Sequence, residues 1–216
     1  MARSRFLALA AATALAALPA PAVAQLNWHP AVGVLAGWNS STVQGTGISS
    51  IKARSGFMAG AMLDAYPRAR FSVQAEVQYT QKGAKGIRSD TAAIVPTPLN
   101  ADVRVDYVEV PVLLRLNGNK LGGLVTPHLL AGPYLAFKAG CSVSGGSSSV
   151  PTPVACTDFG DFRYNDYGGI AGVGADFRMG RTTFITGVRY EWGGRDVVDR
   201  TTQKNRVLNV LAGFRW

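Results

Sequence analysis

Hydrophobic and polar residues alternate along most of the chain after residue 30, with the period of two that is typical of β-strands. The segment RFSVQAEVQYTQ, residues 70–81, shows the pattern most regularly, with apolar side chains at every odd position from Phe71 to Tyr79. This alternation predicts a strand with one apolar and one polar face. It does not say which face meets water, because a soluble barrel turns its apolar face inward and a membrane barrel turns it outward.

Eight segments have this character and are separated by turn or loop sequences. We predict strands at residues 30–40, 54–65, 70–81, 103–116, 125–139, 167–179, 182–193 and 206–216. Pro111 and Pro133 fall inside two of them and are interpreted as local bulges, because proline lacks the N–H of the strand ladder. No stretch after residue 24 has a helical period or approaches the ~18 apolar residues of a membrane-spanning helix. The predicted class is all-β.

The connections between these segments alternate between long and short. Those after the first, third, fifth and seventh segments are long, and those after the second, fourth and sixth are short. An up-and-down barrel places all long connections at one end, which is the asymmetry of outer-membrane barrels with their extracellular loops and periplasmic turns. We therefore predict an eight-stranded antiparallel up-and-down transmembrane β-barrel.

The aromatic residues of the apolar faces indicate which face meets lipid. They are expected in two belts, with small and aliphatic residues between them. One belt, near the long connections, is Trp38, Phe57, Tyr79, Phe137, Tyr190 and Trp192, and the other is Phe71, Phe177, Phe184, Phe214 and Trp216. Aromatic rings favour the headgroup level of a membrane, whereas a protein core would hold large rings centrally. The apolar faces are therefore predicted to point outward.

The opposite faces carry charged residues and many glycines, so the polar side is predicted to line the lumen. The charged residues expected to form a network there are Glu76, Glu109, Arg115, Arg189 and Glu191. Because a lone buried charge is costly, we predict paired charges that plug the interior. A polar channel is the alternative, although eight strands leave little space for a water column.

The N-terminal residues are typical of a signal peptide. Arg3 and Arg5 precede an apolar stretch, and Ala-Val-Ala at 22–24 forms a small-residue cleavage site. We expect residues 1–24 to be the signal peptide and residues 25–216 the barrel domain. Loss of Arg3 and Arg5 lowers the formal net charge from +9 to +7, which we interpret as solubility and scattered loop charge.

Few residues suggest chemistry. Cys141 and Cys156 share a Gly/Ser/Pro-rich stretch and are expected to form a disulfide in an oxidising compartment, and no His lies near them to complete a metal site. His128 is the only histidine within a predicted strand and lies near the short-turn end. The segment GGIAGVG lacks the helix that a dinucleotide site needs. We therefore expect no catalytic residues, no metal and no cofactor.

Several motifs resemble the PorT-like outer-membrane β-barrel family. They are YVEVPVLLRL (107–116), AGPYLAFKAG (131–140), YGGIAGVGADF (167–177), GVRYEWG (187–193) and RVLNVLAGFRW (206–216), in the order of that family's strands. The resemblance implies an eight-stranded barrel in a Gram-negative outer membrane and little about activity. The last motif, which ends at Trp216, also looks like the signal read by the outer-membrane assembly machinery.

The function expected from these features is that of a non-enzymatic outer-membrane barrel whose long loops bind a protein or glycan partner. Phosphates of lipopolysaccharide are possible partners for the basic loop residues Lys82, Lys85, Arg88, Arg195, Arg200 and Lys204. Nucleic acid is not an expected partner, because no basic cluster carries an aromatic recognition motif. The alternatives are a small-solute pore and a secreted, soluble lipocalin-like barrel with its apolar faces inside.

Overall fold

The computed structural model describes residues 30–44, 48–49, 52–89, 101–144, 154–155, 164–196 and 204–216. Eight long strands make up nearly all of these residues. They are β1 (Ala31–Gln44), β3 (Lys52–Ala65), β4 (Phe71–Ser89), β5 (Ala101–Asn117), β6 (Val125–Ser144), β8 (Asn165–Met179), β9 (Thr182–Asp196) and β10 (Lys204–Arg215). Two short strands, β2 (Ile48–Ser49) and β7 (Val154–Ala155), pair with β4 and β6. In this part of the chain no helix is long and apolar enough to cross a membrane.

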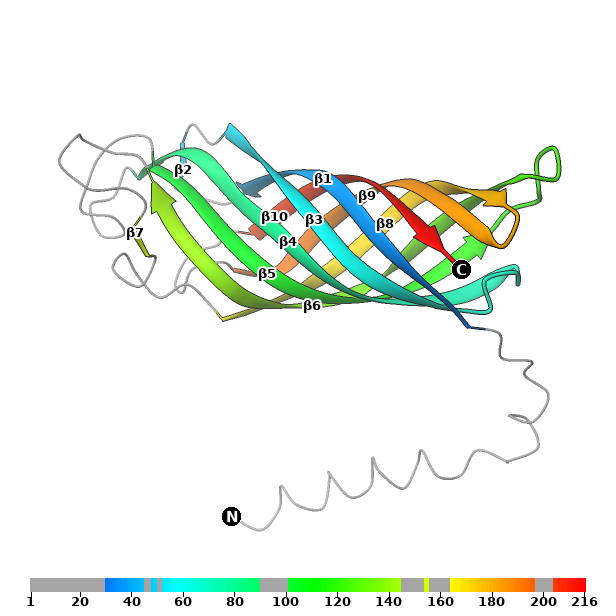
Figure 1. Cartoon of the computed structure of the whole chain (residues 1–216). Coiled ribbons are helices and arrows are strands. Elements are labelled where there is room, and N and C mark those ends of the chain that lie inside the picture. The colour runs from blue at the N-terminus through cyan, green and yellow to red at the C-terminus, as the bar shows by residue number, and fades with distance from the viewer. Residues whose placement is uncertain are drawn as a thin grey trace, which may run out of the picture.

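The eight long strands close into one antiparallel barrel. Each pairs with the long strands before and after it in sequence, and β1 pairs with β10 from Gly33–Arg215 to Gln44–Lys204. Figure 1 shows the strands winding obliquely around a common axis, with the short turns together at one end. Closure leaves no unpaired strand edge, which a barrel in hydrocarbon requires. The predicted fold class is confirmed.

The short turns lie between β3 and β4, β5 and β6, and β8 and β9. The last is a two-residue turn in which Gly180 has a φ of +64°, a backbone conformation that glycine adopts without a Cβ penalty. Between β3 and β4, Ala69 N donates to Tyr66 O over 2.9 Å. The ends of β1 and β10 are joined at the same end by paired backbone hydrogen bonds of Val32 and Trp216.

Several strands extend further toward the long loops than alternation predicts. The strand β4 continues to Ser89 rather than residue 81, and β6 continues to Ser144 rather than 139. Beyond the lipid-facing band the outward positions need not be apolar, so the pattern fades while backbone pairing continues. The register shifts lie in the halves of the strands nearer the long loops, between Ala53/Met58, Ala84/Ile87, Asp106/Tyr107 and Lys204/Arg206.

The interpretation of Pro111 and Pro133 as bulges is wrong. The pairing of β5 with β6 keeps one register from Tyr107–Lys138 through Pro111–Tyr134 to Asn117–His128. Pro133 likewise pairs with Gly169 without a shift between β6 and β8. A missing N–H removes one hydrogen bond but adds no residue, so the barrel retains its register on both sides of each proline.

Candidate functional site

The outer face of the barrel carries the predicted aromatic residues. Phe184 lies between Phe177 and Phe214, with ring centroids 6.1 and 5.3 Å away, at the short-turn end. At the other end Phe57 lies beside Tyr79, with ring centroids 5.6 Å apart. The other predicted belt residues are all exposed on the outer face: Trp38, Phe71, Phe137, Tyr190, Trp192 and Trp216.

Aliphatic side chains cover the outer face between these rings. Val77 and Leu114 are each 56% exposed, and Leu129 is 53% exposed. Exposure of a continuous aliphatic band to water is unfavourable, whereas the acyl chains of a bilayer accommodate such a band. This face excludes the lipocalin-like alternative, in which the same residues would lie inside.

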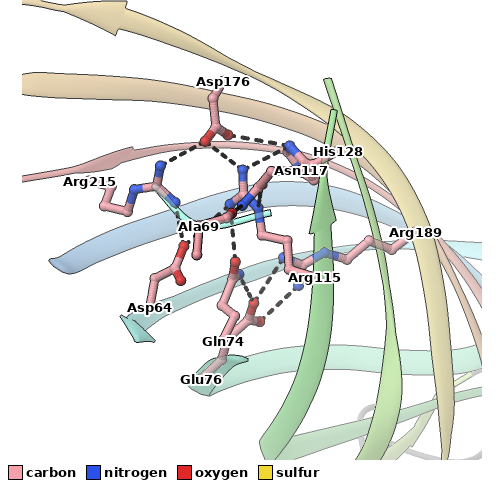
Figure 2. A network of polar contacts seen from close by, with 10 residues as sticks. All are labelled: Asp64, Ala69, Gln74, Glu76, Arg115, Asn117, His128, Asp176, Arg189 and Arg215. Carbon is pink, nitrogen blue, oxygen red and sulfur yellow. Dashed lines mark hydrogen bonds and ion pairs between the residues drawn. The ribbon is translucent and has the colours of Figure 1, made fainter. Parts of the chain in front are cut away.

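Arg115, on β5, is the centre of a polar network inside the short-turn end of the barrel (Figure 2). Its side chain is fully buried and reaches Asp176 Oδ2 at 2.5 Å through Nη2. The same nitrogen lies 2.9 Å from His128 Nδ1, which also lies 3.4 Å from Asp176 Oδ1. Arg115 Nε donates to Asn117 Oδ1 over 2.8 Å, and Nη1 donates to Gln74 Oε1 over 3.3 Å.

Two further arginines complete this network. Arg189 Nη1 and Nη2 donate to the two carboxylate oxygens of Glu76, each over 2.8 Å, from a position 113 residues later in sequence. Arg215 bridges Asp64 and Asp176, with 2.7 Å from its Nη2 to Asp176 Oδ2. The arginine network, as we call it, is Asp64, Gln74, Glu76, Arg115, Asn117, His128, Asp176, Arg189 and Arg215. The three positive charges of its arginines are equal in number to the three negative charges of its carboxylates.

A second cluster surrounds Lys82, farther from the short-turn end than the arginine network. Its ammonium is 2.5 Å from Glu109 Oε1 and 2.8 Å from Glu191 Oε2, and it lies 4.6 Å from the centre of the Tyr134 ring. The carboxylates have further donors, because Gln78 Nε2 donates to Glu109 over 2.9 Å and Asn209 Nδ2 donates to Glu191 over 2.6 Å. The Lys82 cluster is Gln78, Lys82, Glu109, Tyr134, Glu191 and Asn209.

The prediction of loop residues is wrong for five basic residues that lie in β4, β9 or β10: Lys82, Lys85, Arg88, Arg195 and Lys204. Lys82 lies in β4 and has no exposed surface. The sequence held the signal, because Lys82 continues the inward parity of Gln74, Glu76 and Gln78. The five charged residues predicted for the lumen are all buried, but the structure divides them. Glu76, Arg115 and Arg189 join the arginine network, whereas Glu109 and Glu191 share Lys82.

Large side chains occupy the interior along its length. Leu35, Met58, Met62, Ile185 and Leu211 form one buried apolar group on the lumen side of β1, β3, β9 and β10. Another group, on β5, β6 and β8, is Val105, Tyr107, Leu113, Leu130, Tyr134, Ala136 and Ile170. Glycines make this filling possible: a Cβ at Gly172 would lie 2.8 Å from Arg189 Cγ, and one at Gly174 would lie 2.5 Å from His128 Nε2.

Some predicted features fall outside the described residues. Cys141 is half-buried in β6, but Cys156 is not described, so the disulfide stays a prediction. The signal peptide, Arg200 and most of the long connections also lie outside. Within the described ranges, no group of three or more His, Cys, Asp or Glu side chains is placed to hold a metal ion.

A closed eight-stranded barrel with an aliphatic belt outside and paired charges inside is an outer-membrane β-barrel. The chain belongs to the family described as outer membrane protein beta-barrel domain, whose model matches residues 19–198. The protein is therefore located in the bacterial outer membrane, where barrels of this kind have long extracellular loops and short periplasmic turns.

Solved barrels of low sequence identity are similar to the chain. The outer membrane protein OprG from Pseudomonas aeruginosa has a TM-score of 0.50 at 10% identity, covering 88% of this chain and 97% of OprG. Neisserial surface protein A has a TM-score of 0.48 at 17% identity, covering 86% and 97%. Ail of Yersinia pestis, solved with the heparin analogue sucrose octasulfate, has a TM-score of 0.45 at 16% identity, covering 87% and 99%. No curated protein matches the chain.

Proposed function

We propose that the protein is a non-enzymatic outer-membrane barrel whose lumen is closed by side chains and whose extracellular loops bind its partners. The observation that supports closure is the complete burial of Arg115, Lys82 and Glu109. Ion pairs also cross the lumen, because Lys82 and Glu76 of β4 contact Glu191 and Arg189 of β9 on the opposite part of the wall. Each charge has an opposite charge within 2.8 Å. An ion crossing the lumen would have to separate these pairs in a space too narrow for a continuous water column.

Conductance in planar bilayers tests this proposal. Refolded protein, checked for a heat-dependent shift in gel mobility, is expected to give no steady current. A general porin added afterwards to the same bilayer serves as the positive control. Stable unitary currents from the protein alone would contradict closure and favour the small-solute pore.

The extracellular cations support lipopolysaccharide as one partner. Lys85 is exposed, and Lys204 is half-buried at the start of β10. Arg88 lies in β4 and Arg195 in β9, while Lys82 is removed from the set by its burial. Phosphate groups are suited to such residues because they accept charge-assisted hydrogen bonds. We propose that the same loops also form the binding surface for a protein or glycan partner.

A charge-matched pair of variants tests the lipopolysaccharide contact. Replacement of Lys85, Arg88, Arg195, Arg200 and Lys204 by Ser removes five positive charges from the extracellular end. The control uses the same replacement by Ser for the five exposed cations of the periplasmic end, which are Arg68, Arg70, Lys120, Arg178 and Arg181. Only the first variant is expected to lose cross-linking to lipopolysaccharide in intact cells, where this lipid occupies the extracellular leaflet and does not reach the periplasmic cations. Equal binding by both variants would remove the proposal.

Finer features belong to the same proposal. The five ordered motifs support the PorT-like family. Ala22-Val23-Ala24 supports cleavage before Gln25, which N-terminal sequencing of the mature protein tests.

Recognition by the assembly machinery through β10 is tested by deleting Trp216 and measuring insertion of the barrel into the outer membrane. The Cys141–Cys156 disulfide is tested by gel mobility with and without a reductant.

A further inference from the structure

The periplasmic mouth of the barrel contains a cavity with a volume of about 440 Å³. All three periplasmic turns contribute to its wall, and the end of β10 completes it. Asp176 and Arg215, which belong to the arginine network, also line this cavity. The cavity is therefore a vestibule that opens to the periplasm and reaches the buried arginine network.

The exposed charges that line the vestibule are all positive. The cations that line it and are exposed are Arg68, Arg70, Lys120, Arg178 and Arg181. The turn segments 66–70, 117–124 and 180–181 contain no Asp or Glu. The carboxylate in the lining, Asp176, is already held by Arg115 and Arg215. In the described part of the chain, none of the five exposed cations forms an ion pair.

Two of these cations lie where β4 and β8 meet the vestibule. Arg178 directly follows Phe177 in β8, and this phenylalanine is exposed on the outer face. Neighbouring residues of a strand point to opposite faces, so Arg178 has the parity of the lumen. Arg70 directly precedes β4 and lines the same cavity. Phospholipid headgroups surround a barrel at its circumference, whereas this lining faces the aqueous mouth.

We propose that the vestibule binds a multivalent, phosphate-bearing anion from the periplasm. A concave site lined by one sign of charge with low-dielectric walls concentrates counter-ions. Arginine guanidinium groups bind phosphate oxygens with paired, charge-assisted hydrogen bonds, and lysine binds them as a point charge. The cavity volume admits a compact anion with several phosphates, and convergence of five cations favours multivalent ligands over a single phosphate.

Calorimetric titration with inorganic tripolyphosphate tests this site in the full-length barrel refolded in zwitterionic detergent. The variant Arg70→Gln/Arg178→Gln is expected to weaken binding at least about tenfold, a factor that corresponds to ~1.4 kcal/mol. The control Lys52→Gln/Arg206→Gln removes two cations at the extracellular end that lie outside the lipopolysaccharide set, and it is expected to bind like the original protein. No binding by the original protein, or equal weakening in both variants, would overturn the proposal.

Two additional measurements keep the result interpretable. The variant Arg70→Lys/Arg178→Lys retains both charges and is expected to recover part of the lost affinity. If Arg70→Gln/Arg178→Gln does not reach the folded, heat-modifiable form, Arg68→Gln/Arg181→Gln changes turn residues only and is expected to weaken binding similarly.

Nanodiscs distinguish the source of the phosphate. Tripolyphosphate affinity that is equal in phosphatidylcholine discs and in discs with added phosphatidylglycerol supports a ligand dissolved in the periplasm. The opposite result has two parts: tripolyphosphate affinity is lost in the phosphatidylglycerol discs, and phosphatidylglycerol co-purifies with the original protein but not with Arg70→Gln/Arg178→Gln. This result would overturn the proposal of a ligand dissolved in the periplasm and assign the site to lipid headgroups.

Discussion

Replacement of Lys82 by Met is the most direct test of the ionic interior. Met has a similar length and no charge, so Lys82→Met leaves Glu109 and Glu191 buried without their shared cation. With an effective dielectric of ~20, two charges 2.8 Å apart attract by roughly 6 kcal/mol, most of which offsets their desolvation. Removal of one partner of a buried pair costs ~3–5 kcal/mol, and we expect Lys82→Met to lower the free energy of unfolding by about this amount.

The assay is reversible urea unfolding in lipid vesicles, followed by tryptophan fluorescence and checked by heat-dependent gel mobility. The control Lys85→Met removes an exposed lysine of the same strand and is expected to change stability by less than ~0.5 kcal/mol. The triple variant Lys82→Met/Glu109→Gln/Glu191→Gln removes every charge of the cluster and is expected to regain most of the loss. Equal stabilities of Lys82→Met and Lys85→Met would refute the inference that the interior charges are desolvated.

Three further changes probe other parts of the barrel by the same unfolding assay. Arg189→Lys replaces two parallel hydrogen bonds to Glu76 with one point charge and is expected to cost about 1–2 kcal/mol; no loss would mean that the guanidinium geometry is unimportant. Gly174→Ala places a Cβ against the backbone oxygen of Thr186 and 2.5 Å from His128 Nε2, so we expect a loss of ~1–3 kcal/mol; unchanged stability would mean that the strands shift to admit the methyl group. Leu129→Arg puts a charge on the lipid-facing surface and is expected to cost ~2–4 kcal/mol; a negligible effect would place residue 129 outside the hydrocarbon region.

The sequence was sufficient to predict which face of each strand meets lipid. Side chains alternate strictly along a strand, so the alternation places Val73 and Gln74 on opposite faces, and the aromatic residues of all strands then indicate which face meets lipid. Alternating loop lengths then determined which strand ends lie together. Both inferences depend on local sequence, and the structure places Val73 outside and Gln74 inside as expected.

Charge partners could not be predicted in the same way. The pairing of Glu76 with Arg189 depends on the relative heights of β4 and β9, which the registers of all intervening strands determine together. Alternation predicts the face on which each residue lies but not its position along the barrel axis. The bulges near the long loops make the heights still harder to infer, because each adds a residue to one strand. Lys82 is different, since parity alone would have placed it inside.

Pairing of charges inside the barrel has a consequence for where free charge remains. The carboxylates of the arginine network are matched by Arg115, Arg189 and Arg215, so this network presents little net charge to the periplasmic mouth. The exposed cations of the turns, such as Arg178 and Arg181, therefore determine the electrostatic potential there. Five exposed cations lie together at this end of the described structure. An anion entering the vestibule meets cations that form no ion pair within the described structure, whereas one entering the lumen would have to displace an existing carboxylate.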